Sequence, residues 1–159
     1  MEEVLQLKKD NRLKIKIVDS EGIDTGEYLE FDLEDIDLPL RLNKCDIMHK
    51  NNMNGLKIQL SVIEKKEDHK GKYLLSWKEE ESLKVIKEFY NREIEALDLF
   101  LGKGGTAKLL NGRQPYYEMF DDIKEMLEPI IPKLENQKKA IVNKVKEKYK
   151  KTEEGLVIE

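Results

Sequence analysis

Two segments near the N-terminus alternate strictly between apolar and polar residues, and this pattern constrains the fold more than any other. The first segment alternates the apolar Leu13, Ile15 and Ile17 with the cationic Arg12, Lys14 and Lys16. The second segment alternates the apolar Leu29, Phe31 and Leu33 with Tyr28 and the acidic Glu30 and Asp32. A period of two is typical of a β-strand with one buried face. The loop between the segments carries Gly22 and Gly26, so the spacing predicts an antiparallel β-hairpin over residues 12–33.

A lone hairpin is marginally stable in water, so its apolar face must cover another element. Composition indicates that this element is helical. Charged residues make up 39% of the 159 residues, the same share as hydrophobic residues, whereas an ordinary charged share is about 25%. This surplus favours long helices with a solvated side and leaves little material for a wide sheet. We therefore expect a mostly helical α+β fold, with the N-terminal antiparallel β-hairpin packed on four to five α-helices.

Chain length and charge limit the other possibilities. A chain of this length is expected to form a single domain, residues 1–159, with a helical body over residues 38–150 and a flexible tail over residues 151–159. The net charge of −4 argues against a general binder of nucleic acid or anionic membranes. One cysteine excludes a disulfide framework within the chain. The start lacks a signal-peptide pattern and no apolar run is long enough for a membrane helix, so we expect a soluble cytoplasmic protein.

Helical periodicity and end signals predict the elements of the body. A first helix is expected from about Pro39 to Lys66, capped by Asp37. Ser76 and Glu79 form a capping box that opens a helix over residues 77–101, which Gly102 ends. A short helical turn follows, and then a helix that Pro115 opens and Pro129 breaks. The final helix is expected to reach about residue 150.

Cys45 and His49 are four residues apart, so they share one side of the first helix. This spacing could form half of a metal site or a thiol–imidazole pair. No further ligands stand nearby in the sequence, and a half-buried histidine beside an apolar cysteine is the favoured interpretation. The spacing therefore leaves the role of these two residues open.

Two other patterns also favour a structural interpretation. The segment Gly102–Thr106 suggests a phosphate loop, but its lysine precedes the glycine pair and a helix precedes the segment, which favours a connector between helices. The carboxylate pairs Glu93/Glu95 and Asp121/Asp122 are expected on solvent-facing sides of helices. Since no nucleophile, base and orienting group converge, we expect no enzyme, no cofactor and no metal site.

The final helix is rich in lysine. Residues 133–151 carry eight lysines against two glutamates, which suggests contact with phosphates or with an acidic protein. This stretch has no arginine, and Tyr149 is its sole aromatic residue. Proteins that bind nucleic acid normally use arginine for bidentate phosphate contacts and several aromatic side chains for stacking on bases. A nucleic-acid-associated regulator is therefore the less favoured alternative.

The segment from Leu97 to Gly112, LDLFLGKGGTAKLLNG, resembles the tail assembly chaperones of long-tailed bacteriophages and related prophage particles. The resemblance continues through Phe120 to Leu127, the EPII segment at residues 128–131 and the KEKY segment at residues 146–149, and covers about residues 85–149. It implies a non-enzymatic protein that binds and solubilises the tape measure protein and helps to recruit tail tube subunits. Such a protein stays in the host cytoplasm and is not retained in the mature particle. A structural tail or connector component is the alternative, and self-association remains open.

The candidate partner-binding residues come from this same region. They comprise the glycine-rich turn, nearby apolar residues and two adjacent tyrosines. Because the two tyrosines cannot both face inward, one of them is a candidate exposed anchor. The candidates are Phe100, Gly102, Gly104, Gly105, Leu109, Leu110, Tyr116, Tyr117 and Met119.

Overall fold

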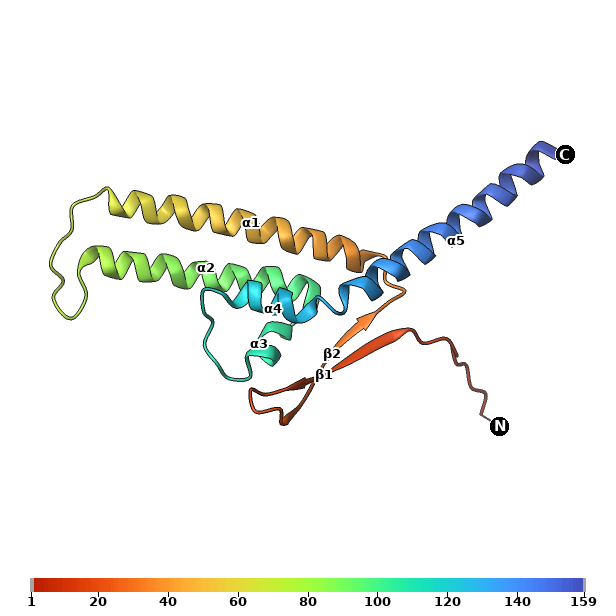
Figure 1. Cartoon of the computed structure of the whole chain (residues 1–159), viewed down its shortest axis with the longest axis horizontal. Coiled ribbons are helices and arrows are strands. Elements are labelled where there is room, and N and C mark those ends of the chain that lie inside the picture. The colour runs from red at the N-terminus through yellow and green to blue at the C-terminus, as the bar shows by residue number, and fades with distance from the viewer. Residues whose placement is uncertain (1, 159) are drawn as a thin grey trace.

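A two-stranded antiparallel hairpin precedes the helices, which confirms the predicted mostly helical α+β fold (Figure 1). The computed structural model describes residues 2–158, and the side chains of residues 2–150. Over these residues the elements are β1 (Arg12–Val18), β2 (Asp24–Asp32), α1 (Asp37–Glu64), α2 (Trp77–Leu101), α3 (Gly105–Leu110), α4 (Met119–Leu127) and α5 (Ile131–Ile158).

The hairpin buries the face that the alternation predicts. Ile15 pairs with Leu29 and Leu13 pairs with Phe31, so apolar residues share one side of the sheet. On the other side Arg12 forms an ion pair with Glu30 at 3.1 Å. Phe31 is 2% exposed and its ring stacks on that of Phe100 in α2, with 5.0 Å between the centroids. The apolar face of the hairpin therefore covers a helix, as the marginal stability of a lone hairpin requires.

α1 and α2 form a long antiparallel pair joined by residues 65–76 (Figure 1). α1 continues through Gly55, and the expected cap at Asp37 is wrong, because Asp37 lies in the first turn and its carboxylate binds Arg41. At the start of α2 the predicted capping box is present: Ser76 accepts from the N–H of Glu79, whose carboxylate accepts from the N–H of Ser76. α2 ends at Leu101, and Gly102 follows with a φ of 92° that favours glycine.

The prediction that Pro115 opens a helix is wrong. Residues 113–116 have no regular structure, and α4 begins at Met119. The ring of Tyr116 lies under the guanidinium of Arg113, and its hydroxyl donates to Asp122 at 2.8 Å. These contacts hold the segment against the start of α4 without helical geometry. The break at Pro129 is confirmed, since residues 128–130 form a turn between α4 and α5.

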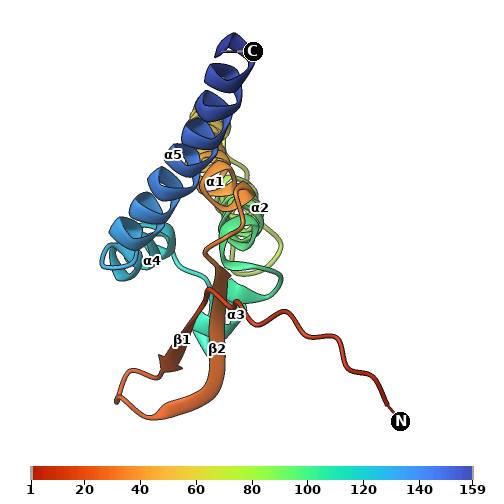
Figure 2. The same cartoon turned by 90° about the vertical axis from the view of Figure 1, so that its right-hand side faces the viewer.

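The core lies at one end of the α1–α2 pair, where the hairpin, α3, α4 and the start of α5 meet it. It contains the aromatic and aliphatic residues Ile17, Leu29, Phe31, Leu38, Cys45, Ala96, Leu97, Phe100, Leu101, Met119, Phe120, Ile123, Leu127 and Leu134. Two projections leave this core in different directions: the far end of the α1–α2 pair, and α5 (Figures 1 and 2). α5 is helical to Ile158, whereas we expected a tail from residue 151. Lys151, Glu153 and Glu154 are good helix formers, and they carry the helix past the expected end.

Candidate functional site

α4 lies on one end of the seam between α1 and α2 and inserts its apolar side into it. Phe120, Ile123 and Leu127 recur at helical spacing and are buried in the core. Phe120 stacks on His49 of α1 with parallel rings, 3.8 Å between centroids. At the edge of this contact Lys124 of α4 forms an ion pair with Asp46 of α1 at 2.9 Å. The molecule thus contains one example of a short amphipathic helix bound on the α1–α2 pair.

In the part of the chain that the structure describes, the same seam continues past the start of α4 without a covering helix. On α1, Met53 and Leu60 follow His49 by 4 and 11 residues. On α2, Ile86 and Phe89 precede Glu93 by 7 and 4 residues. At these helical spacings, each pair continues the side of its helix that faces α4. Met53, Leu60 and Ile86 are half-buried, whereas Phe89 is 4% exposed, so the accessible area of this surface comes from its neighbours. Tyr117 is 52% exposed, and its ring lies against that of Phe89 with 6.2 Å between the centroids. We call Met53, Leu60, Ile86, Phe89 and Tyr117 the distal seam.

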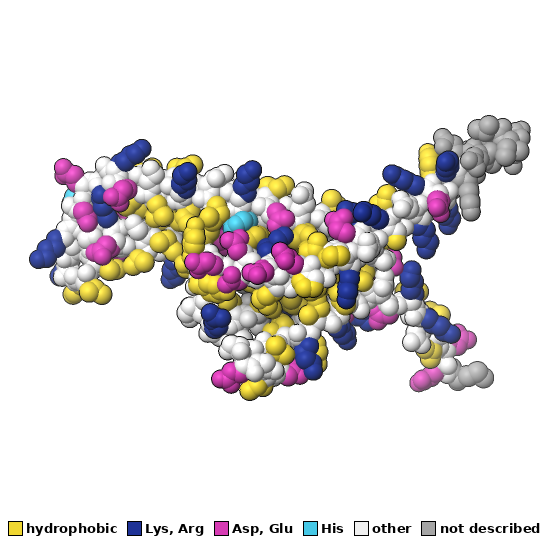
Figure 3. Space-filling view, viewed as in Figure 1, with side chains coloured by type: hydrophobic (Ala, Val, Ile, Leu, Met, Phe, Trp, Pro, Cys, Tyr) yellow, Lys and Arg dark blue, Asp and Glu magenta, His cyan; other side chains and the backbone are white. Residues whose placement is uncertain are grey.

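Figure 3 shows hydrophobic side chains along the α1–α2 pair on this face, continuing away from the histidine at its centre. Single exposed apolar residues are normal on a soluble protein, whereas a continuous apolar strip is typical of an interaction site. The distal seam is therefore the candidate binding surface for an apolar helix.

A buried polar network stands at the boundary between the covered and uncovered parts of the seam. Glu93 in α2 is 2% exposed. Its Oε2 lies 2.5 Å from Nδ1 of His49, and its Oε1 accepts from Nδ2 of Asn52 at 2.9 Å. The prediction that Glu93 faces solvent is therefore wrong. The carboxylate is held inside the fold because two polar side chains of α1 meet it, which meets the requirement that buried polar groups be hydrogen-bonded.

Cys45 lies one turn before His49 on α1, and it is fully buried. Burial raises the pKa of its thiol to about 12, so the thiol is protonated at neutral pH. A protonated buried thiol is a poor nucleophile and a poor metal ligand. Among the described residues, no group of three or more His, Cys, Asp or Glu side chains could hold a metal ion. These observations favour the structural interpretation of the Cys45–His49 pair.

We expect Cys45 to be protected from alkylation in the folded protein. With the pKa near 12, its reaction at pH 8 should be about 1,000-fold slower than that of a free thiol, because only the thiolate reacts. Protection should disappear in urea, and a thiol-reactive chromophore measures both rates. Since the folded pKa lies above the unfolded one, this contribution to stability is present below about pH 8.5 and is lost as the pH rises toward 12. Rapid native labelling would contradict the burial.

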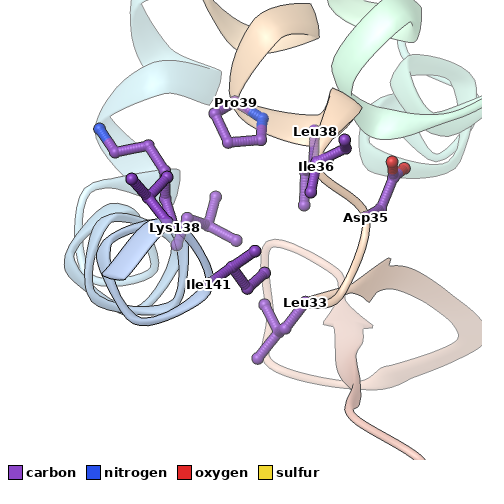
Figure 4. Close-up of a pocket in the computed structure, with 9 residues that line it drawn as sticks. Leu33, Asp35, Ile36, Leu38, Pro39, Lys138 and Ile141 are labelled. Atoms are coloured by element: carbon purple, nitrogen blue, oxygen red, sulfur yellow. The ribbon is translucent and has the colours of Figure 1, made fainter. Parts of the chain in front are cut away.

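A second concave feature lies where the hairpin, α1 and α5 meet. It is a pocket of about 90 Å³, and Figure 4 shows Leu33, Ile36 and Ile141 around it. The pocket is too small for a cofactor, since ligand sites measure about 300–1,000 Å³. Its lining is mostly apolar and comprises Leu33, Asp35, Ile36, Leu38, Pro39, Leu134, Lys138, Ile141 and Val142. This volume suits one apolar side chain.

The glycine-rich candidates serve the backbone of the α2–α3 connection. A Cβ on Gly105 would lie 2.5 Å from Cβ of Leu101, so this position requires the close approach that only glycine allows. The backbone N–H and the hydroxyl of Thr106 both donate to the carboxylate of Asp98, at 2.9 and 2.7 Å. A carboxylate of the chain itself thus fills the place that a phosphate would take. The interpretation of Gly102–Thr106 as a helix connector is confirmed.

The other candidates fall into two groups. Phe100 and Met119 are buried in the core, whereas Leu109, Leu110 and Tyr116 are half-buried and pack against it. Gly102 and Tyr117 are exposed, and Gly104 is half-buried. The structure therefore brings Tyr117 alone of the candidate side chains to the distal seam, and it confirms that just one of the two adjacent tyrosines is exposed.

Sequence reasoning did not find most of the distal seam. Apart from Tyr117, its members come from α1 and α2, and more than 20 residues of sequence separate the two sets. The one available signal was the match of apolar stripes on two long helices, which predicts a core as readily as a surface.

Comparison with known proteins found no relative of this chain. No protein-family model, curated protein or solved structure matches this chain. Separately, none of the described helices is long and apolar enough to cross a membrane.

Proposed function

We propose that this protein is a non-enzymatic tail assembly chaperone that binds and solubilises a tape measure protein and helps to recruit tail tube subunits. Two observations support the proposal. Residues 85–149 resemble such chaperones, and the α1–α2 pair already holds one amphipathic helix, α4, beside an uncovered apolar continuation of the same surface. The second observation carries the proposal, because a chaperone for an apolar helical client needs a place where one more helix can lie.

The distal seam suits such a client in size and chemistry. Helix recognition on a helical surface uses apolar anchors at spacings of three, four and seven residues, which a tape measure helix would supply. Met53 lies one turn from His49, at the end of the distal seam next to α4, and methionine adapts to different neighbouring side chains. The charged exterior of this protein, 39% of its residues, would keep the complex in solution. The role needs no bond to be made or broken.

Co-expression with the tape measure protein of the same particle tests the proposal. We expect a soluble complex of fixed stoichiometry in size-exclusion chromatography with light scattering. The double variant Met53→Glu/Tyr117→Ser should lower the affinity by about tenfold or more, since it places a charge and removes an anchor on the seam. If the wild-type chain gives no complex, or if the double variant binds as tightly as the wild type, the proposal is wrong.

Ile58→Ser is the matched control for these variants. Ile58 is on α1 and 64% exposed, but it follows the buried Leu56 by two residues and therefore lies on the opposite side of the helix. Its replacement should leave the complex intact. Mass spectrometry of purified particles separates the alternatives, because a chaperone should be absent from them and a structural tail component should be present.

A further inference from the structure

Among the described residues, no helix or strand covers the outer half of α5, from Val142 to Lys150. Every residue from Val142 to Lys150 is exposed, and this part of the helix projects away from the body (Figures 1 and 2). Val142, Val145 and Tyr149 recur at three- and four-residue spacing and form an apolar stripe, with Val145 62% and Tyr149 71% exposed. Helices owe most of their stability to packing of such a stripe. Such a stripe is typical of a helix surface that packs against a partner.

The charge of α5 selects the kind of partner. Residues 138–150 carry six lysines and one glutamate. Pairing of α5 with α5 of another copy would set lysines against lysines, which is destabilising. A surface that covers the stripe must instead be acidic and must offer apolar area of its own.

The outer side of α4 has these properties. Glu118, Asp121, Asp122, Glu125 and Glu128 lie on or next to this helix and are exposed. Met126 stands among them and is 57% exposed. The one lysine of α4, Lys124, is turned toward Asp46 of α1, so its charge is offset there. Figure 3 shows acidic side chains over α4 and lysines along α5.

We propose that α5 of one copy lies on the acidic outer side of α4 of a second copy, and that the contact is reciprocal. The stretch from Lys139 to Lys150 is about 17 Å long and that from Glu118 to Glu128 about 15 Å, so the two faces match in length. Within one chain they cannot meet, because the turn at Pro129 directs α5 away from α4 (Figure 1). A two-fold axis uses each face once in each copy and closes the assembly as a dimer.

Protein is favoured over nucleic acid as the occupant of α5. Valine side chains gain nothing from a phosphate backbone, whereas they gain from contact with Met126. The carboxylates of α4 would also repel DNA that approached the neighbouring helix. This inference concerns a surface separate from the distal seam, and it does not depend on the proposed function.

Charge exchange tests the dimer. In low salt the wild-type protein should sediment as a dimer, and salt should weaken it because the contact is exposed and electrostatic. Lys144→Glu/Lys146→Glu and Glu125→Lys/Glu128→Lys should each raise the dissociation constant by about tenfold or more. An equimolar mixture of the two variants should dimerise again, since both contacts in the mixed dimer unite opposite charges. Circular dichroism checks that each variant is folded.

A charge-matched control and the opposing outcomes complete the test. Lys57→Glu/Lys87→Glu changes the net charge by the same amount on exposed positions of α1 and α2, and it should leave the dimer intact. A monomeric wild-type protein, or a mixture that fails to dimerise, overturns the proposal. A monomer that binds duplex DNA and loses this binding in Lys144→Glu/Lys146→Glu would assign α5 to nucleic acid instead.

Discussion

Replacing His49 with alanine is expected to lower the free energy of unfolding by about 3–5 kcal/mol, because it leaves the carboxylate of Glu93 buried without its imidazole partner. Asn52 alone would then serve a side chain that is 3% exposed. The variant also loses the parallel stack of His49 on Phe120, which helps to hold α4 on α1. Urea unfolding followed by circular dichroism measures the difference.

His69→Ala is the matched control, since His69 is exposed in the α1–α2 connection. Its replacement should change the free energy of unfolding by less than about 1 kcal/mol. The double variant His49→Leu/Glu93→Leu should recover most of the loss, because replacing the buried pair with apolar residues no longer leaves a buried carboxyl group without its partner. Equal effects of His49→Ala and His69→Ala would show that the carboxylate does not depend on the imidazole.

Replacing Phe31 with alanine should cost about 3–5 kcal/mol, the range for deletion of a large core side chain. Phe31 is the hairpin residue whose ring stacks on Phe100 of α2, so its loss leaves a cavity between the sheet and the helices. Thermal and urea unfolding should both detect the change.

Tyr28→Ala is the control on the same strand, because Tyr28 is on the opposite face of the hairpin and about half exposed. It should cost less than about 1 kcal/mol. If Phe31→Ala and Tyr28→Ala are equally stable, the hairpin does not pack on α2 in solution and is not part of the core.

The elements that the sequence predicted most accurately have local signals at their ends. α2 begins and ends where the capping box at Ser76 and the glycine at 102 place it, since each signal acts through hydrogen bonds and backbone angles of its immediate neighbours. The hairpin was predictable for the same reason, because alternation and turn residues lie within one short segment. The Pro129 turn also follows from a local clash of the proline ring.

Elements and sites that depend on distant residues were not predictable. Glu93 has a helical position that periodicity assigns to either side, and its burial follows from His49 and Asn52, which lie 44 and 41 residues away in the sequence. Pro115 can open a helix, but Tyr116 is held by Arg113 and Asp122 before the helix begins. The candidate binding residues were placed in the region of resemblance, where several turned out to be core. Burial depends on what packs against a residue, and the pattern of its sequence neighbours does not show partners that lie more than 40 residues away.

The position of the core at one end of the α1–α2 pair has a consequence for motion. Between the middle of the pair and the 65–76 connection, the buried apolar residues among those described are Leu56, Ile63 and Phe89, fewer than at the opposite end. Local opening costs least where the fewest apolar contacts are lost. Amide exchange should therefore be fastest at the tip of the pair and slow progressively toward Cys45 and Ala96. The far end of the α1–α2 pair can therefore open locally while the rest of the molecule stays folded, so that a helix bound there could adjust the spacing of α1 and α2 without unfolding the core.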